Sequence, residues 1–383
     1  MNIKPGEPVV VTQCPRPSVE GKIPWGEYQF PDIERTAEGY LHASYHINAD
    51  SATAYGKPKG HALSCDGGKT WSPCKKDEGY MGGLEIGDGS RIRIFDRIAV
   101  NPGDIELPEK TDAEKTFWGV LPQFYYAGRF GDDFNAWSVE RRFADGQWTS
   151  QMKPARLPCN AARYVIDGVM PYNMLWRIRI APDGTVWGIA YPFFINGYKD
   201  KTVMQPAFVV SEDNGETFRF LSTIPYQPVP SADPFYDKRD GFTEPDVAFL
   251  PDGTVMCIMR TQDSNGNGPS YVCYSRDNGT HWSVPEIFDD LGVWANLLTL
   301  KCGVTLASYG RPGVYIRATS DPAGKKWGPR IRILDPDTPS CSYTGIVAAG
   351  DKTAVMVYSH FNYRGGDGVP RKTIFARTIE IDV

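Results

Sequence analysis

The sequence predicts an all-β protein built as a six-bladed β-propeller. A short pattern, Ser-x-Asp-x-Gly-x-x-Trp, recurs along the chain, and strand-like apolar segments lie between its copies. With 39 Gly and 31 Pro in 383 residues, the composition favours many short strands joined by turns. No segment has convincing helical periodicity, so the strands are expected to account for the fold.

The repeated pattern is clearest at residues 64–71 and 275–282. Residues 211–218 end in Phe instead of Trp, residues 320–327 form a divergent copy, and residues 145–148 resemble a remnant of a fifth. Asp or Asn ahead of Gly is typical of a tight turn in which the Gly takes a positive φ. The aromatic residue that follows can pack beneath its own sheet. Such a turn at recurring intervals indicates a repeated β-unit.

The first predicted strand covers residues 7–12, and in a propeller it would close the ring by joining the last sheet. The first unit has strands at 28–34 and 40–46. The second unit, 80–150, is the least regular and carries a long insertion around 101–115. If this region splits, seven blades are the alternative to six.

The remaining units repeat one form, in which an apolar strand, a Pro-Asp-Gly or similar turn and further strands follow one another. These units lie at 174–218, 242–282, 294–327 and 341–383. The last unit lacks the repeated turn, as expected if the N-terminal strand completes it. No linker divides the chain, which predicts a single domain over residues 1–383.

The composition argues against several classes of partner and cofactor. A net charge of −5 provides no basic face, so no nucleic-acid partner is expected. None of the eight Cys residues forms a Cys-x-x-Cys pair, so neither a metal site nor a cofactor is predicted. Cys257 and Cys273 lie in apolar strand segments and are expected to be reduced core residues.

The N-terminus, Met-Asn-Ile-Lys-Pro-Gly-Glu, has no apolar segment of the kind found in signal peptides. No run of residues approaches the length of a membrane span. We therefore expect a cytoplasmic protein without a membrane partner. A processed start would instead allow a secreted or periplasmic location.

The repeated turn resembles the Asp box, or BNR repeat, of the sialidase (neuraminidase) superfamily, and the chain resembles that superfamily over nearly its whole length. This resemblance implies a site on the propeller axis, far from the boxes. In sialidases three Arg residues bind the substrate carboxylate, a Tyr activated by a Glu is the nucleophile, and an Asp is the acid/base. The partner implied is a carbohydrate with an acidic sugar.

Four segments resemble the parts of the sialidase site. Thr243-Glu244-Pro245-Asp246 is similar to the Asn-Glu-Pro segment, which implies that Glu244 activates the nucleophile. The segment 341–346 resembles the one that carries the nucleophile, here Tyr343. Arg260 and Arg311 resemble the second and third Arg. Asp50, in the loop before the first box, lies about where the acid/base belongs.

Elementary chemistry supports these roles but leaves alternatives open. A phenol has a pKa near 10, so Tyr343 needs a base such as Glu244 within hydrogen-bond reach, and glycosidases with a Tyr nucleophile are known. The alternative is a Tyr bonded to a structural Glu. Arg260 and Arg311 end apolar strands, where a charge is costly unless it is paired or faces a ligand. Pairing with Glu244 or Asp246 is the alternative to an anion clamp.

The chain departs from the sialidase pattern at the first Arg. It has Tyr28-Gln29-Phe30-Pro31 where the family has Phe-or-Tyr-Arg-Ile-Pro, and Arg35 follows at the wrong spacing. Bidentate Arg–carboxylate contacts supply much of the specificity for acidic sugars. Arg177, which shares a strand face with Arg179, is the candidate replacement. A blade-to-blade ion pair is the competing interpretation.

His46 competes with Asp50 for the acid/base role. A His has a pKa suited to proton transfer, and related propellers that cleave uronate-linked polysaccharides rely on a His. Our preferred hypothesis is a sialidase-like glycoside hydrolase that releases a terminal, acidic sugar. The first alternative is a polysaccharide lyase or a uronate-adjacent glycosidase that uses His46 and a Tyr. The second is a non-catalytic glycan-binding propeller, because the fold alone does not define the chemistry.

Overall fold

The fold is all-β, as the turn-rich sequence predicted. The computed structural model describes residues 1–18, 23–51, 57–75, 82–95, 100–117, 119–132, 134–171, 175–261 and 266–382. Within these ranges the only helices are two single 3-10 turns, η1 (Pro102–Asp104) and η2 (Ala127–Arg129). None of the helices in this part of the chain is long and apolar enough to cross a membrane.

Five four-stranded antiparallel sheets follow one another along the chain. Sheet 1 contains β3 (Gln29–Arg35), β4 (Leu41–His46), β5 (Lys59–Ser64) and β6 (Ser72–Pro73). Sheet 2 contains β7 (Leu84–Glu85), β8 (Arg91–Phe95), β10 (Ala136–Arg142) and β11 (Trp148–Pro154). Sheet 3 contains β13 (Leu175–Ile180), β14 (Val186–Ala190), β17 (Ala207–Ser211) and β18 (Arg219–Thr223).

Sheets 4 and 5 have no interruption between their strands. Sheet 4 contains β19 (Phe242–Phe249), β20 (Val255–Thr261), β21 (Ser270–Ser275) and β22 (Glu286–Asp289). Sheet 5 contains β23 (Val293–Thr299), β24 (Thr305–Gly310), β25 (Val314–Thr319) and β26 (Ile331–Leu334).

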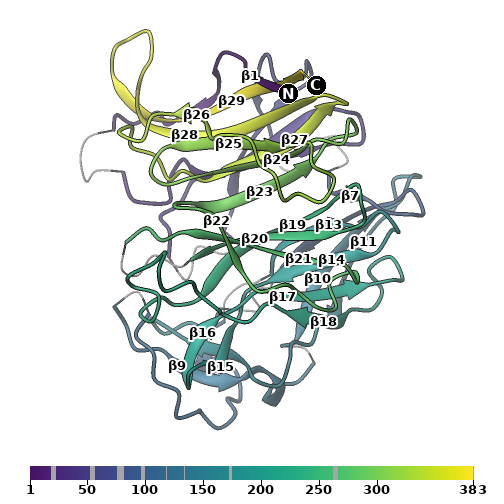
Figure 1. Ribbon diagram of the computed structural model, residues 1–383, viewed down its shortest axis with the longest axis vertical. Coiled ribbons are helices and arrows are strands. Elements are labelled where there is room, and N and C mark those ends of the chain that lie inside the picture. Colours follow the sequence, from purple (N-terminus) through teal and green to yellow (C-terminus); the bar gives the residue numbers. More distant parts are fainter. Residues whose placement is uncertain are drawn as a thin grey trace.

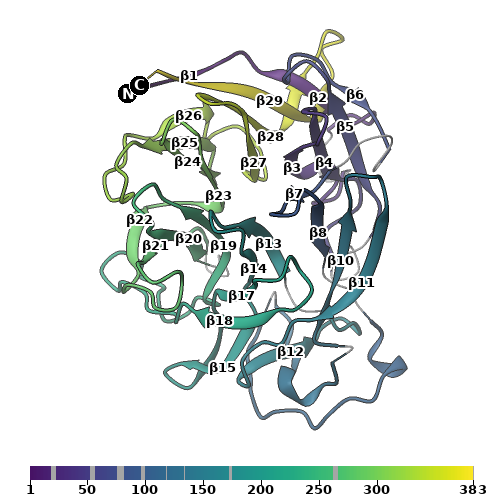
Figure 2. The same ribbon diagram turned by 90° about the vertical axis from the view of Figure 1, so that its right-hand side faces the viewer.

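Sheet 6 joins the two ends of the chain. Its strands are β27 (Thr344–Gly350), β28 (Thr353–Arg364), β29 (Pro370–Asp382), β1 (Asn2–Pro5) and β2 (Val9–Gln13). Both N-terminal strands pair with β29, with Asn2 opposite Asp382 and Val9 opposite Ala376. The two termini accordingly lie side by side (Figures 1 and 2). The assignment of the whole chain to one domain stays a prediction.

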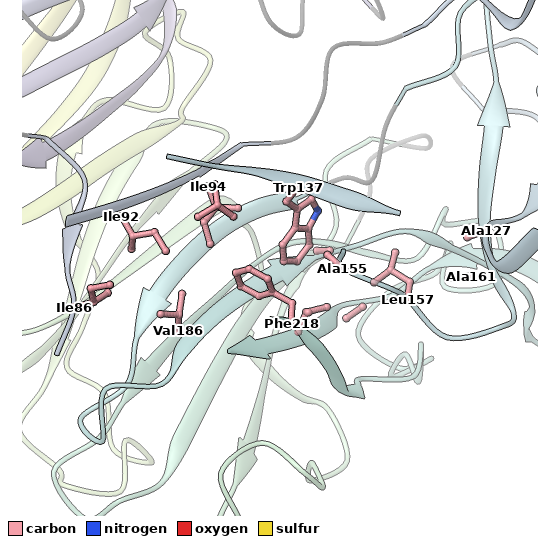
Figure 3. Packing of buried hydrophobic residues seen from close by; sticks show 14 of the residues in the cluster. Ile86, Ile92, Ile94, Ala127, Trp137, Ala155, Leu157, Ala161, Val186 and Phe218 are labelled. Atoms are coloured by element: carbon pink, nitrogen blue, oxygen red, sulfur yellow. The ribbon is translucent and has the colours of Figure 1, made fainter. Parts of the chain in front are cut away.

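The six sheets follow one another around the molecule, with β3, β7, β13, β19, β23 and β27 toward the middle (Figure 2). Buried apolar clusters join sheet 2 to 3, 3 to 4, 4 to 5, 5 to 6 and 6 to 1. Figure 3 shows Ile92, Trp137 and Val186 in the cluster between sheets 2 and 3. Sheets 1 and 2 are linked by an ion pair of 2.6 Å between Glu34 and Arg93.

A further sheet was not predicted from the sequence. It contains β9 (Gln123–Tyr126), β12 (Ala161–Val165), β15 (Phe193–Tyr198) and β16 (Lys201–Met204). These strands come from three separate insertions, between β8 and β10, between β11 and β13, and between β14 and β17. Because neighbouring strands are antiparallel, all three insertions leave from the face at which the first strands of the sheets begin. We call this the front face and the opposite one the back face.

The repeated turns lie on the back face, between the third and fourth strands of their sheets. In the turns at 64–71, 211–218 and 275–282, the Ser hydroxyl accepts a hydrogen bond of 2.8 Å from the Gly backbone N–H. The Ser also donates to the Asp of the same turn. We call these three turns, together with 320–327, the box turns. Each closes a hairpin far from the front face.

The Gly of each box turn packs against the preceding sheet. Gly279, for example, has a φ of +78°, and a Cβ placed on it would lie 2.2 Å from the indole of Trp187 in sheet 3. Gly324 is similarly close to Leu250 of sheet 4. Only glycine tolerates this combination of dihedral angle and close approach. The box turns therefore help to pack each sheet against its neighbour.

Candidate active site

The first strands of three sheets carry a β-bulge where they begin on the front face. In β3, β19 and β23 the pairing register shifts just after Gln29, Thr243 and Val293. At the bulges Phe30, Glu244 and Trp294 have φ values of 51°, 49° and 50°. Positive φ is uncommon outside Gly, and a bulge redirects the side chain that it carries. Structurally equivalent positions therefore bring these three side chains toward a common centre.

Tyr343 lies at that centre, immediately before β27. Its ring stacks on Trp294 with 4.3 Å between ring centroids and packs against Phe30 at 4.9 Å. Ser342, the residue before it, also has a positive φ, of 61°. The Tyr343 side chain is only 9% exposed, and its hydroxyl group donates a hydrogen bond to the Glu244 carboxylate. The predicted nucleophile and its predicted base are thus in direct contact.

Arg260 completes this group. Its Nη1 donates to Glu244 Oε1 at 2.7 Å and to the Tyr343 hydroxyl oxygen at 3.1 Å. The second Glu244 oxygen accepts from the backbone N–H of Trp294 at 2.9 Å. Burial and the Glu244 charge raise the pKa of Tyr343 well above its usual range, although Arg260 and Arg311 act against this. The phenol is therefore protonated at neutral pH and would lose its proton only as Glu244 accepts it.

Arg260 therefore forms the ion pair with Glu244. The sequence had left this pairing open as the alternative to an anion clamp. Its side chain and that of Glu244 are 5% and 7% exposed. A buried charge is tolerated when it is paired in this way. Arg260 thereby contacts both members of the Tyr–Glu pair, and its part in binding a substrate carboxylate stays a prediction.

Arg311 directly follows β24 and packs against the Tyr343 ring. Its guanidinium is 5.3 Å from the centre of the Tyr343 ring and 5.7 Å from that of Trp25. Its Nη2 donates to the Cys341 carbonyl at 2.9 Å. Stacking on two rings holds the planar guanidinium in a fixed orientation. Arg311 therefore brings a positive charge to the same centre as Tyr343.

Asp50 is held against Trp25. The Asp50 backbone N–H donates to the Trp25 carbonyl at 2.8 Å. Asp50 is an exposed residue, but partial desolvation by its surroundings raises the pKa of its carboxyl group; the Trp25 side chain opposes this rise, and the charge of Glu244 adds to it. Asp50 is connected to the centre around Tyr343 through Trp25, on whose ring Arg311 stacks. A carboxyl group with a raised pKa suits a proton donor.

His46 lies opposite Gln29 at the end of β4, where its ring meets the edge of Phe30 at 5.1 Å. Burial and, to a lesser extent, Lys59 lower the pKa of His46 to about 4. Within the described ranges its ring makes no hydrogen bond, and none joins it to Tyr343. His46 is thus neutral at physiological pH and shares Phe30 as a neighbour with Tyr343.

Arg177 takes part in a pair between sheets. Its Nη1 lies 3.6 Å from Asp246 Oδ2 and donates to the Asn296 side chain. Arg179 contacts the same carboxylate at 2.5 Å. The Arg177 side chain is 11% exposed, and its guanidinium is 5.7 Å from the Trp294 ring. These contacts are the blade-to-blade ion pair named above as the competing interpretation, so its substrate-binding role stays a prediction.

Sequence reasoning missed Trp25, Phe30 and Trp294, which surround the predicted residues with aromatic rings. The equivalence of Phe30, Glu244 and Trp294 depends on strand register, and no local pattern marks it. Gln29, at the position of the missing Arg, is fully buried, and its amide nitrogen and oxygen have no hydrogen-bond partner among the residues that the structure describes. Gln29 therefore supplies no positive charge where the sialidase pattern has one.

The described part of the chain contains no group of three or more His, Cys, Asp or Glu side chains that could hold a metal ion. Cys257 and Cys273 are fully buried free thiols in the core between sheets 3 and 4. Burial raises the pKa of both thiols. The two residues therefore belong to the core and not to the site.

Comparisons with known proteins support the fold. No protein-family model matches the chain, and no curated protein matches it. A solved structure of a protein of unknown function from Dyadobacter fermentans matches with a TM-score of 0.64 and 17% identity, over 99% of each chain. The Hadza microbial sialidase Hz136 matches with a TM-score of 0.53 and 16% identity, over 91% of this chain and 65% of the sialidase.

A mutant of the NanB sialidase from Streptococcus pneumoniae matches with a TM-score of 0.55 and 12% identity, over 96% of this chain and 70% of the sialidase. The chain therefore spans about two thirds of the length of these sialidases. At these identities the likeness concerns the fold. The chain has a sialidase-like all-β fold.

Proposed function

We propose that the protein is a sialidase-like glycoside hydrolase that releases a terminal, acidic sugar from a glycan. The observation that carries this proposal is the hydrogen-bonded group of Tyr343, Glu244 and Arg260. Under this proposal sheets 1 to 6 are the six blades of a single propeller domain, and the box turns are its Asp boxes. The sheet of β9, β12, β15 and β16 is then an insertion on the face that carries the site.

In the first step the Tyr343 oxygen attacks the anomeric carbon while its proton passes to Glu244. The carbon–oxygen bond to the leaving group breaks, and Asp50 gives its proton to the leaving oxygen. The raised pKa of Asp50 supports this role, because the carboxyl group must be protonated before it can act. The product is a sugar joined covalently to Tyr343.

In the second step the Asp50 carboxylate removes a proton from a water molecule that attacks the anomeric carbon. The bond to Tyr343 breaks, and the phenolate recovers its proton from Glu244. The retained charge of Arg260 stabilises the phenolate during both steps because its Nη1 lies 3.1 Å from the phenolic oxygen. The anomeric configuration is retained after two displacements.

Arg311 supports the choice of an acidic sugar. Its guanidinium lies beside Tyr343 and is held by ring stacking, so a substrate carboxylate could pair with it next to the attacked carbon. With Gln29 in place of the first Arg, the anion site carries less positive charge than a site with three Arg residues. We expect selectivity among acidic sugars to depend mainly on Arg311.

His46 favours one second candidate, a polysaccharide lyase or a uronate-adjacent glycosidase. With its pKa lowered to about 4, the imidazole is neutral at physiological pH and can accept a proton. Tyr343, protonated at the same pH, could return one. Phe30 contacts both rings, so a substrate would have to reach past it to touch both groups.

The test is incubation of the protein with a glycan panel that includes sialosides and uronate-containing polymers. A hydrolase releases a reducing sugar, a lyase creates an unsaturated uronate that absorbs ultraviolet light, and a glycan-binding propeller does neither. Tyr343→Phe serves as the inactive control. Release of a reducing sugar that this variant still catalyses would contradict the proposed nucleophile.

A further inference from the structure

Trp25 is an exposed aromatic residue that contacts Arg311 and Phe30 of the candidate site. It precedes β3, and 47% of its surface is accessible. Its ring meets the edges of Phe30 and Phe361, each at 5.9 Å between centroids, and the Arg311 guanidinium lies 5.7 Å from it. An indole held by two rings and a guanidinium while half of it faces solvent offers a fixed apolar surface beside the site.

Trp25 is also tied to the proposed acid. Its carbonyl accepts a hydrogen bond of 2.8 Å from the Asp50 N–H, and its side chain lowers the Asp50 pKa against the effect of burial. Gly26 allows this approach: it has a φ of +103°, and a Cβ there would lie 2.2 Å from the Asp50 nitrogen. The backbone segments that carry Trp25 and Asp50 are therefore held against each other.

Exposure alone does not identify a binding surface. Trp148 is 44% exposed, yet it lies on the outermost strand of sheet 2, where Arg142 stacks on it at 4.7 Å. Trp25 differs because its neighbours, Asp50 and Arg311, are the proposed proton donor and anion-binding group. Trp148 is consequently a control of matched type and exposure.

We propose that the exposed face of Trp25 binds the leaving-group sugar of the substrate. This inference rests on the proposed function, in which Asp50 protonates the oxygen that joins the two sugars. The sugar on the leaving side of that oxygen must lie next to Asp50, and Trp25 is held there. The apolar face of a pyranose can pack flat on an indole, and such packing buries area on both partners. The preferred substrate is then an oligosaccharide, with a neutral sugar as its leaving group.

Kinetics with two leaving groups test the inference. Each pair of substrates shares one terminal acidic sugar, which is linked either to fluoride or to lactose. One pair carries sialic acid and a second pair carries glucuronic acid. Fluoride has no ring to stack and needs no proton. We expect Trp25→Ala to lower kcat/KM for the lactoside 10- to 100-fold more than kcat/KM for the fluoride, because any loosening of Arg311, which stacks on Trp25, affects both substrates alike. Equal losses with both substrates, or no loss with either, would overturn the inference.

Two further variants separate the stacking of a sugar on Trp25 from the effect of the indole on the Asp50 pKa. Trp25→Phe keeps a ring but removes the indole N–H, so KM for the lactoside should stay within about threefold of wild type. The alkaline limb of the lactoside pH profile should move to higher pH, because the indole N–H, which lowers the Asp50 pKa, is lost. Trp148→Ala should match wild type. A KM for Trp25→Phe as high as that of Trp25→Ala would contradict stacking.

Binding of lactose alone distinguishes failure of this inference from failure of the proposed function. Saturation-transfer NMR on the full-length wild-type protein should show lactose in contact with protein, and Trp25→Ala should abolish the signal while Trp148→Ala retains it. If the wild-type protein turned over no glycan, the proposed function would be refuted, whereas the lactose-binding result would stand. No lactose contact with the wild type, or contact that Trp25→Ala retains, would refute the sugar surface.

Discussion

The front and back faces of this protein use their acidic residues in different ways. On the back face Asp66 and Asp277 accept hydrogen bonds from the backbone and hydroxyl groups of their own turns, and these bonds lower their pKa values. On the front face Glu244 and Asp246 are buried and paired with Arg side chains from neighbouring strands. The back-face turns can form locally, whereas the front-face pairs require the assembled sheets.

Backbone strain differs in the same direction. The box turns place positive φ at Gly, or at an Asn such as Asn278, which tolerates it. On the front face Phe30, Glu244, Trp294 and Arg311 have positive φ although their side chains disfavour it. Such strain persists only where the surrounding structure imposes it. Under the proposed function the back face contributes stability and the front face carries the chemistry.

The largest expected effect is the loss of turnover in Tyr343→Phe, since no oxygen remains to attack the anomeric carbon. Glu244→Gln should lower kcat on the order of 10²-fold or more, because the phenol loses its base. Steady-state kinetics on the natural glycan measure both effects. Circular dichroism controls for folding. A fully active Tyr343→Phe protein would show that Tyr343 on the front face is not the nucleophile.

Arg311 and Arg177 should separate binding from stability. Arg311→Ala should raise KM for an acidic glycan by a factor that corresponds to roughly 1.5–3 kcal/mol, the range for a lost charged hydrogen bond. Arg177→Ala should instead lower the free energy of unfolding by about 1–3 kcal/mol, because the buried Asp246 loses a partner. Denaturant titration and kinetics on both variants decide between these outcomes. A neutral glycan affected equally by Arg311→Ala would argue against an anion site.

Gly279→Ala should destabilise the protein without changing the activity of the folded fraction. A left-handed φ costs about 1–2 kcal/mol for a residue with a Cβ, and overpacking against Trp187 adds about 1–3 kcal/mol. Gly253→Ala is the matched control, with a φ of +85° and no atom of the described residues within 4 Å of the added Cβ. Thermal unfolding should show the larger loss for Gly279→Ala. Equal losses of stability in the two variants would mean that packing of the box turn on sheet 3 contributes nothing to the stability of the protein.

His46 is expected to give a smaller, pH-dependent effect on stability. Its pKa is about 4 in the folded protein and about 6.5 in the unfolded chain, so the unfolded chain binds more protons between these values. Stability should therefore be full above pH 6.5 and fall by up to about 3 kcal/mol as the pH drops to about 4. His46→Gln should flatten this slope in urea titrations at several pH values. An unchanged slope would contradict burial of a neutral imidazole.

Features of the back face could be predicted from the sequence more fully than those of the front face. The box turns and the strand Leu41–His46 could be predicted because each depends on residues close together in the chain. The sheet of β9, β12, β15 and β16 could not, because it gathers strands from three insertions whose pairing has no local signal. The same limit applies to Trp25, whose meeting with Asp50 and Arg311 depends on three separate loops.

The site itself was predicted only through resemblance. Tyr343 and Glu244 are 99 residues apart in sequence, and nothing in either segment alone indicates their hydrogen bond. The ion pairs of Arg260 and Arg177 were open alternatives because alternation gives a side chain's face but not its partner. The assembled sheets supply those partners.

Covalent trapping tests the role of Tyr343 most directly. A fluorinated acidic sugar with a good leaving group, such as a 2,3-difluorosialic acid or a 2-fluoroglucuronyl fluoride, slows the second displacement more than the first. Mass spectrometry of the intact protein should then show the addition of one sugar, and digestion should place it on the peptide that contains Tyr343. Glu244→Gln should accumulate this adduct far more slowly. Turnover of the unfluorinated sugar without any adduct, or an adduct on another residue, would contradict Tyr343 as the nucleophile.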